Sequence, residues 1–486
     1  MTHHRECLGQ ATLFEGTGHC TCPKGWPRKA KVAKPKRPAP TPNPCYGAAL
    51  SVTTTPTTHY RVRFPFTPSV AQLSAYATRK KHHIPQTRDF DDETGEACGR
   101  DTFNDEAIRT LSRNYAKDPL YPKVEGYRIL QKALGTYIAK LRSGDLIGPD
   151  HRLRDRYRHT PKTLRLAMEM LQVLPRPERG VEADDPRSVY DAIRKCFIPT
   201  PGHEFAAADF SNIEPMLVAY FARDSAFLRA CRTSSHSWFA AHVIGRTVDF
   251  SLSDADIAAY YDELAHGGPY VIGAGRSART LPWKSIRDGC KTAGMASLYV
   301  GGPLQISRSR PDIFPTSTVA KYYQDAFFAL CPKVREWHWA QAEAVERHGY
   351  LTGPNGFRLH YEEPFTYAKN AAGVWERQLS PTAKQAIAAV PQHTGALYLV
   401  TAFLAFCDEH PELAQWCRLL IHDEIFGEPP VERADEFIAV LSQVMTRPHP
   451  LMPLDWCSDA ERAVMGTHLS VNVEAKRSTV SWGDMR

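Results

Sequence analysis

The sequence contains no apolar run long enough to cross a lipid bilayer, since the longest extends only over residues 395–407 and has polar residues on both sides. A run of this length is typical of a buried helix. The first residues show no basic segment followed by an apolar one, so we expect no secretory signal. The twelve cysteines form no CxxC pair, which favours free thiols in a reducing cytoplasm over a disulfide scaffold.

Acidic side chains are almost missing from the first 59 residues, which hold eight Lys and Arg against two Glu. Nearly all of the formal net charge of +7 therefore lies in this segment, and the rest of the chain is close to neutral. Clustered cations gain affinity for phosphate backbones by releasing counterions. We expect this tail to bind nucleic acid or to attach the protein to an accessory protein of replication.

Large apolar residues are also scarce between Pro23 and Pro44, where seven prolines alternate with lysines. Such a segment cannot bury enough surface to fold, so residues 1–59 are expected to form a disordered tail. A zinc site is conceivable there, but the irregular spacing of the candidate ligands favours free thiols. These candidates are Cys7, His19, Cys20, Cys22 and Cys45.

The remaining sequence is long and apolar enough for two to four subdomains. Apolar residues recur at helical spacing from about Tyr60, for example at Ile108 and Leu111, and the first part is expected to be all-helical. Strand-like runs follow at residues 204–210 and 419–426, with long helical patterns between them. The predicted fold class is α+β.

Acidic residues stand at both strand-like runs. Asp209 ends the first run, and Ser211 and Glu214 after it have the spacing of a capping box. In the second run, His422, Asp423 and Glu424 interrupt apolar residues, as expected of a tight hairpin turn that exposes its acids. Carboxylates brought together raise each other's pKa, and divalent cations relieve this conflict. The pattern predicts a site for a pair of Mg²⁺ ions.

Between the strands, Arg287, Lys291, Met295 and Tyr299 recur at intervals of four and would form one stripe along a helix. Two cations followed by an apolar and an aromatic side chain would suit the phosphates and the base of a nucleotide. The alternative is an ordinary amphipathic helix with a solvated basic start. Internal glycines at 289 and 294 argue against that alternative, because each costs roughly 1 kcal/mol relative to Ala.

Together these segments resemble the family A DNA polymerases. Residues 209–224 resemble motif A, residues 287–299 resemble motif B, and His422-Asp423-Glu424 resembles motif C. Weaker similarities occur in the family's order, and the likeness covers residues 60–486. The weaker ones lie at residues 136–137, 166–175, 235–245, 348–358 and 384–394.

The resemblance implies a right-hand polymerase with an antiparallel-sheet palm, helical fingers and a helical thumb, in a phage-like form reduced to the polymerase domain. Its location would be the cytoplasm of a bacterium or an infected host cell, without a membrane. The implied divisions are a tail at 1–59, a thumb at 60–160, a first palm part at 161–235, fingers at 236–375 and a second palm part at 376–486.

The resemblance further implies a DNA-directed DNA polymerase that adds dNTPs to the 3′-OH of a primer–template. The implied ligands of two Mg²⁺ ions are Asp209, Asp423 and the carbonyl of Phe210. The implied catalytic residues are Asp209, Asp423, Glu424 and Lys291. The nucleotide would be bound by Glu214, His236, Arg287, Lys291, Met295 and Tyr299. The DNA would be contacted by Arg165, Gln172, Gln392 and His422.

Some residues depart from the family pattern. Met295 stands where the family has Phe or Tyr, and Met is typical there of single-subunit RNA polymerases. Glu214, which in DNA polymerases excludes ribonucleotides, and Glu424, where the RNA enzymes have Ser, favour DNA synthesis. Met216 and Ala388 replace an Arg and an Asn, which would reduce contacts to the template. An RNA polymerase and an inactive DNA-binding scaffold remain as alternatives.

Two further expectations concern segments without a matching motif. The region before the thumb is too short for a 3′→5′ exonuclease domain and shows no exonuclease signature, so we expect no proofreading. Residues 245–285 are longer than the family's fingers usually allow and have no assigned role.

Overall fold

The computed structural model describes residues 69–86, 101–150, 152–158, 163–175, 182, 184–272, 278–369 and 373–485. By its internal contacts the chain divides into two units, residues 1–66 and 67–486, and every described residue belongs to the second. The basic tail and the zinc candidates at positions 7, 19, 20, 22 and 45 lie outside the described residues.

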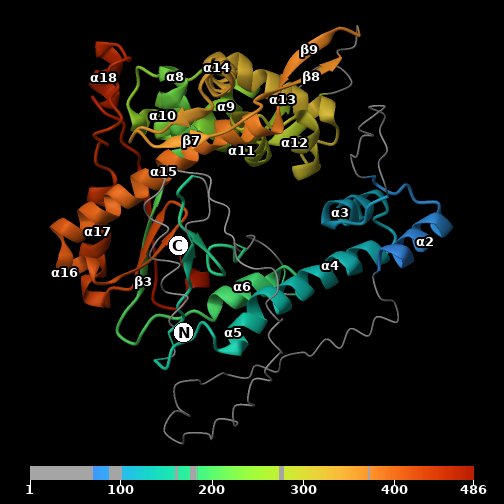
Figure 1. The fold of residues 1–486 in the computed structure, drawn as a ribbon, viewed down its shortest axis with the longest axis horizontal. Coiled ribbons are helices and arrows are strands. Elements are labelled where there is room, and N and C mark those ends of the chain that lie inside the picture. Colours follow the sequence, from blue (N-terminus) through green and yellow to red (C-terminus); the bar gives the residue numbers. More distant parts are fainter. Residues whose placement is uncertain are drawn as a thin grey trace, which may run out of the picture. The chain divides into compact units, whose positions relative to one another are not determined.

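A four-stranded antiparallel sheet joins the two strand-like runs of the sequence (Figure 1). Its strands, in spatial order, are β10 (Cys417–Ile421), β11 (Glu424–Gly427), β3 (Phe205–Phe210) and β12 (Val473–Ser478). The predicted run at 204–210 is thus a strand, and the run at 419–426 is a hairpin of β10 and β11. Because β3 pairs with β11, Asp209 lies directly opposite Glu424.

Each face of the sheet packs into its own apolar core, as expected from the alternation of side chains along a strand. Ala206, Ala208 and Ile425 belong to the larger core, which also contains side chains of helix α17 (Ala434–Met445). Phe205, Ala207 and Phe426 belong to a second core. Asp209 shares the face of Ala207, so it stands where this second core ends.

Gly427 allows helix α17 to lie close against the sheet. A Cβ atom at this position would be 2.4 Å from the ring of Phe437, far inside a normal contact distance. A larger residue at 427 would therefore push the helix away from the end of β11.

Most helices between β3 and β12 form one group of packed elements (Figure 1). Within it, α9, α11 and α13 contact one another. The helices are α7 (Ile213–Phe221), α8 (Ser225–Thr233), α9 (Ser235–Val243), α10 (Asp254–His266), α11 (Trp283–Leu298), α12 (Pro303–Ser309), α13 (Ser317–Leu330) and α14 (Pro332–His348). Residues 245–285, which have no match in the family pattern, contain α10 and a hairpin.

The expectation that the part before β3 is all-helical is confirmed for most of residues 105–143 and is wrong at residues 157–158 and 167–168, which pair as two short antiparallel strands. The helices of this part are α2 (Val70–Lys80), α3 (Asp105–Asn114), α4 (Leu120–Lys132), the π-helix η1 (Ala133–Ile138), α5 (Ala139–Ser143) and α6 (Ser188–Lys195). In η1 the Tyr137 hydroxyl donates a hydrogen bond of 2.7 Å to the Val173 carbonyl. This bond connects the helical part to the segment that carries Gln172.

Four two-stranded hairpins and several short helices complete the described structure. The hairpin strands are β1 (Tyr157–Arg158), β2 (Ala167–Met168), β4 (Pro269–Ile272), β5 (Arg279–Pro282), β6 (Tyr350–Thr352), β7 (Arg358–His360), β8 (Phe365–Lys369) and β9 (Trp375–Leu379). The short helices are α16 (Pro411–Ala414), η3 (Val431–Arg433), α18 (Asp459–Met465) and η4 (Trp482–Asp484).

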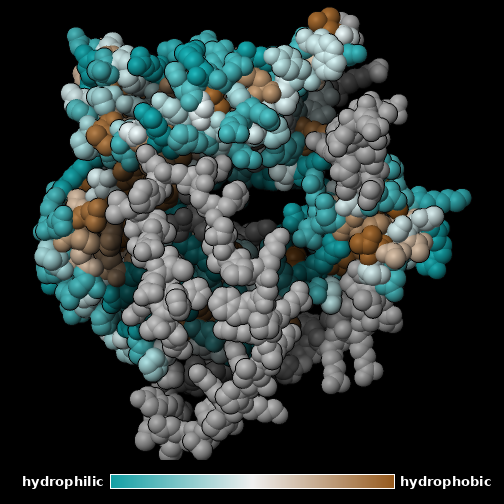
Figure 2. Space-filling model, viewed as in Figure 1, coloured by the Kyte–Doolittle hydropathy of each residue, from teal (hydrophilic) through white to brown (hydrophobic). Residues whose placement is uncertain are grey.

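The longest described helix, α15 (Pro381–Glu409), contains the apolar run of residues 395–407. It is long and apolar enough to cross a membrane by length and composition, but 61% of its most apolar window is buried inside the protein. It contacts α7, α14, α17 and strand β11. The helix therefore has the burial of a core element, as the sequence predicts. Figure 2 shows mostly hydrophilic residues on the visible face of the group formed by α8 to α14.

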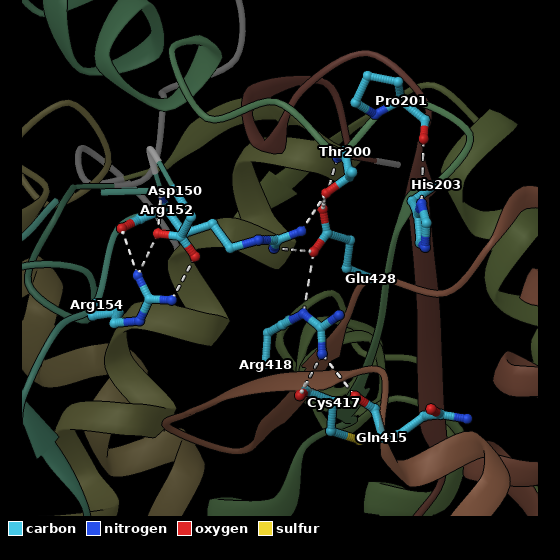
Figure 3. A network of polar contacts seen from close by, with 10 residues as sticks. All are labelled: Asp150, Arg152, Arg154, Thr200, Pro201, His203, Gln415, Cys417, Arg418 and Glu428. Atoms are coloured by element: carbon cyan, nitrogen blue, oxygen red, sulfur yellow. Dashed lines mark hydrogen bonds and ion pairs between the residues drawn. The ribbon is translucent and has the colours of Figure 1, made fainter. Parts of the chain in front are cut away.

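The end of β11 is held by a buried carboxylate at the centre of a polar network (Figure 3). Glu428 is 3% exposed and accepts hydrogen bonds from Arg152 (2.7 Å), Arg418 (3.1 Å) and the backbone and hydroxyl of Thr200 (2.7 and 2.6 Å). Burial alone raises the pKa of a carboxyl, but these bonds outweigh it and lower the pKa of Glu428 to about 2. The network connects three segments far apart in the sequence.

Candidate active site

Acidic side chains from three neighbouring strands lie side by side on one face of the sheet. Asp209 of β3 is opposite Glu424 of β11 on one side and opposite Glu474 of β12 on the other. The Oδ1 atom of Asp209 is buried and accepts no hydrogen bond from the described residues. An oxygen left in this condition is costly unless a cation or another donor reaches it.

The turn between β10 and β11 brings Asp423 to the same place. Ile421 pairs with Glu424, so His422 and Asp423 form a two-residue loop, and His422 adopts the left-handed conformation that such loops require (φ 57°). The Phe210 N–H donates a hydrogen bond of 3.2 Å to the Asp423 carbonyl, which fixes this turn against the end of β3.

The expectation that the turn exposes its acids is wrong for Glu424. Glu424 is 7% exposed and Asp423 is half-buried, because β11 is a central strand with neighbours on both sides. Of the motif, only His422 is exposed. Its ring lies 3.1 Å from the Gln172 amide nitrogen.

Asp209 and Asp423 interact as an acid pair. Burial, followed by the negative charge of Asp209 and a hydrogen bond to it, raises the pKa of Asp423 to about 7. The described residues contain no group of three His, Cys, Asp or Glu side chains that would hold a metal by themselves. Mg²⁺ commonly uses one or two protein carboxylates and completes its shell with water and phosphate. The acid pair and the unpartnered Asp209 oxygen therefore fit Mg²⁺.

Glu214 does not form the predicted capping box with Ser211. Helix α7 begins after Asn212 without a side-chain cap, and the Glu214 carboxylate is turned toward other elements. The Tyr299 hydroxyl donates to it at 2.7 Å, and the Arg165 guanidinium donates at 2.9 Å. A charged, oriented partner outcompetes a local backbone donor here, because hydrogen bonds to ionised groups are the stronger ones.

Tyr299 follows directly after α11 and is held protonated. Burial and then the charge of Glu214 raise the pKa of its hydroxyl. The hydroxyl therefore remains a donor at neutral pH, and the Glu214 carboxylate remains its acceptor. Together they form a fixed polar pair between α7 and α11.

The predicted basic stripe lies on α11, and it faces α9. Arg287 donates a hydrogen bond of 3.2 Å to the Ser237 hydroxyl. Burial, followed by the charges of Lys291 and Arg287, lowers the pKa of His236 to about 4. His236 is thus neutral at pH 7 and lies within the field of both cations. A pocket between these helices is lined by residues that include His236 and Met295.

The helix is not an ordinary amphipathic one, because its glycine at 289 serves close packing. A Cβ atom there would lie 2.9 Å from Ile313 and 3.4 Å from Phe314. Gly294 has no comparable contact, since its nearest atoms would be 3.8 Å away. Only the first glycine is required by the packing of α11.

The residues expected to contact DNA lie near the acid pair or on α15. Arg165 forms an ion pair with Glu214. Its positive charge also lowers the pKa of Asp423, against the stronger effects that raise it. Gln172 accepts a hydrogen bond from the Met168 backbone at 2.8 Å in addition to its contact with His422. Gln392 is half-buried on α15.

Two residues at this site have no signal in the sequence. Lys476 of β12 lies 2.9 Å from the Asp209 carboxylate, and Glu474 lies in register with Asp209. Neither belongs to a recognisable motif, and only the pairing of β12 with β3 brings them here.

Comparisons with known proteins agree with this arrangement. The sequence is 25% identical over 354 residues to thermostable DNA polymerase I of Thermus aquaticus, covering 71% of this chain and 37% of the relative. It is 24% identical over 243 residues to the DNA polymerase of Mycobacterium phage D29, covering 50% of this chain and 32% of the relative. No family model matches the chain.

The structure superimposes on the POL domain of Pol1 from M. smegmatis, which was solved in complex with DNA primer-template and dNTP. The TM-score is 0.60 at 18% identity, over 86% of this chain and 61% of that chain. The fold is that of a family A polymerase domain. In this fold the four-stranded antiparallel sheet corresponds to the palm, and the acid pair lies at the ends of its strands. The chain spans less than two thirds of the length of these relatives.

Proposed function

We propose that the chain is a template-directed DNA polymerase that adds dNTPs to a primer 3′-OH with the help of two Mg²⁺ ions. The observation that carries this proposal is the acid pair of Asp209 and Asp423, assembled from two strand ends, in which one carboxylate oxygen has no donor among the described residues. The relatives named DNA polymerase and the fold of the Pol1 domain support it.

The palm residues would hold the metal ions and orient them. Asp209, Asp423 and the Phe210 carbonyl are the proposed ligands, and buried Glu424 supports them from the next strand. Magnesium bound at such a site lowers the pKa of an attacking hydroxyl and stabilises the charge of a leaving pyrophosphate. The protein contributes a carboxylate pair that is fixed before the substrate arrives.

Helices α9 and α11 would hold the triphosphate. Arg287 and Lys291 supply fixed positive charges, and His236 is uncharged at pH 7, so it would donate a neutral hydrogen bond. Lys291 is the proposed proton donor to the leaving pyrophosphate. Met295 lies one turn further along the same stripe, beside the pocket.

Selection of deoxyribose is assigned to the pair of Glu214 and Tyr299. Tyr299 donates to one oxygen of the Glu214 carboxylate at 2.7 Å and Arg165 donates to the other at 2.9 Å, so the carboxylate is fixed beside the end of α11. A carboxylate fixed there would leave no room for a 2′-OH. The presence of Met at position 295 favours RNA synthesis instead, and a single-subunit RNA polymerase is therefore the second candidate function.

The contacts to primer–template DNA are proposed for Arg165, Gln172, Gln392 and His422. The divisions into thumb (60–160), palm (161–235 and 376–486) and fingers (236–375) are proposed with them. A replication accessory protein at the tail and a cytoplasmic location in a bacterium or infected cell complete the proposal.

Primer extension on a DNA template tests the function. Parallel reactions would contain Mg²⁺ with dNTPs, Mg²⁺ with rNTPs, or dNTPs with EDTA. We expect extension only with Mg²⁺ and dNTPs. Extension with rNTPs would move the protein to RNA synthesis, and no extension in any reaction would favour a binding scaffold.

Proofreading is tested on the same primers. End-labelled primers with a terminal mismatch should keep their length when no dNTPs are present. Rapid shortening by the purified chain would contradict the expectation of no exonuclease activity.

A further inference from the structure

A lysine ammonium lies among the carboxylates of the palm. The Nζ atom of Lys476 is 2.9 Å from Oδ2 of Asp209 and 3.6 Å from Oε2 of Glu424. The Lys476 side chain is 27% exposed, and those of Asp209 and Glu424 are 16% and 10% exposed. This is a partly desolvated ion pair, in which charges interact more strongly than on an open surface.

The backbone register places this cation. Strand β12 runs antiparallel to β3, with Glu474 opposite Asp209 and Lys476 opposite Ala207. Alternate residues share a face, so Lys476 is the diagonal neighbour of Asp209 on the acidic face. The next residue, Arg477, points to the other face and pairs with Glu204 at 2.8 Å. The two adjacent cations of β12 thus serve different sites.

We propose that Lys476 is a built-in counter-ion of the palm carboxylates, which pairs with the Asp209 carboxylate in the metal-free enzyme and weakens the binding of Mg²⁺ to it. The inference rests on the proposed function, because it assumes that Asp209 is a metal ligand. Lys476 pairs with Oδ2 and leaves Oδ1 without a donor among the described residues. A metal ion at Oδ1 would share one carboxylate with the ammonium, and the two cations would repel each other. The ammonium therefore moves aside or weakens the binding of the metal. Lys476 is therefore a positioning residue that sets the metal affinity of the site.

The same ion pair has a second consequence. Without metal, the carboxylates of Asp209 and Glu424 repel each other, and the Lys476 ammonium lies within 4 Å of both. It should stabilise the palm when Mg²⁺ is absent. Removing the charge of Lys476 should therefore increase the affinity for the metal and decrease the stability of the metal-free protein.

Binding of Mn²⁺, measured by titration calorimetry without DNA or nucleotide, tests the proposal. K476Q and K476A should bind Mn²⁺ about tenfold more tightly than the wild type, as expected for removal of one nearby positive charge. K476R, which keeps the charge, should bind as the wild type does. In EDTA, K476Q should melt at a lower temperature than the wild type, and saturating Mn²⁺ should reverse that order.

Lys321→Gln is the matched control. Lys321 forms an ion pair of 2.6 Å with Asp325 on the exposed side of α13, so this variant loses the same charge without touching the palm. It should leave Mn²⁺ affinity unchanged.

D209N separates the two proposals. Loss of Mn²⁺ binding in D209N together with unchanged binding in K476Q and K476A would overturn the role of Lys476 alone. Unchanged binding in D209N would refute the metal centre of the proposed function and the Lys476 inference with it.

Discussion

At the residue scale, the site depends on like charges that are kept close together. Burial, followed by the charge of Asp209, raises the pKa of Asp423. The charge of Arg165 opposes this increase, and Lys476 pairs with Asp209.

Asp423→Asn removes one carboxylate of the pair. We expect nucleotide incorporation to fall by at least about a hundredfold, because a direct metal ligand is worth no less than the groups that support it. DNA binding should stay within a few fold. Single-nucleotide incorporation and a DNA-binding titration check this, with Asp325→Asn on the surface of α13 as the control. Substantial activity in the first variant would mean that the metal assignment is wrong.

Tyr299→Phe leaves the ring and removes the hydroxyl that orients Glu214. A hydrogen bond to a charged group is worth about 1.5–3 kcal/mol, so preference for dNTPs over rNTPs should fall by roughly tenfold or more. Glu214→Ala should lower it further, because the carboxylate itself is then missing. The ratio of kcat/KM for the two nucleotides is the measurement. Tyr322→Phe, at an exposed position of α13, should not change the ratio.

At the element scale, two local contacts help to position the end of strand β11 and helix α11. Glu428 connects the end of β11 with residues 152 and 200, and Gly289 allows α11 to pack against the segment at 313 and 314. Both contacts position elements that carry site residues, although neither reaches a substrate.

Glu428→Gln should lower the free energy of unfolding at pH 7 by about 3 kcal/mol, since it leaves two guanidinium groups without their buried partner. The pKa of Glu428 falls from 4.5 to about 2 on folding. Its contribution is therefore complete above pH 4.5 and is lost as the pH falls toward 2. Between pH 2 and 4.5, the free energy of unfolding of the variant should therefore change less with pH than that of the wild type, which denaturation curves recorded at several pH values would measure.

Glu409→Gln provides the comparison for that experiment. Glu409 pairs with Arg447 at 2.6 Å, but both side chains are more than 40% exposed. Surface pairs contribute about 1 kcal/mol or less. An equal loss of unfolding free energy in both variants would show that the buried network stabilises the protein no more than a surface ion pair does.

Gly289→Ala tests the packing of α11. Alanine favours a helix by roughly 1 kcal/mol, but the new Cβ would collide with Ile313, and overpacking costs about 1–3 kcal/mol. We expect a net loss of stability in urea denaturation. Gly294→Ala, where the Cβ meets only ordinary contacts, should be neutral or stabilising. The opposite order would mean that the close contact at 289 relaxes without cost.

At the scale of the whole molecule, nearly all of the net positive charge lies in residues 1–59, which precede the polymerase fold. The tail holds eight cations, whereas the rest of the chain is nearly neutral. Sequence-independent affinity for DNA should therefore come largely from residues outside the palm and fingers.

Deleting residues 1–59 should weaken DNA binding and make its dependence on salt shallower, by about 0.9 in the logarithmic slope for each phosphate that the tail neutralises in the full-length protein. Titration of a primer–template at several salt concentrations measures this. A full-length variant with the eight Lys and Arg changed to Gln separates charge from length. An unchanged slope in both would leave attachment to a partner as the role of the tail.

Much of the local structure could be predicted from short sequence patterns. The strand that carries Asp209, the helices of residues 105–143 and the turn at His422 and Asp423 depend on neighbouring residues, and the structure has them. The capping box at Ser211 was a wrong prediction for the opposite reason. Glu214 bonds to Tyr299, 85 residues away, and no local pattern contains that partner.

The sequence by itself determined which residues could carry the chemistry, because spacing and residue type place acids at strand ends and cations along one face of a helix. Only the tertiary structure decided which of them meet. Lys476 reaches Asp209 from 267 residues further along the chain, and Arg165 reaches Glu214 from 49 residues before it. The first pairing depends on the register of β12 against β3, and the second on how α7 packs against the segment before β2; contacts between distant segments set both.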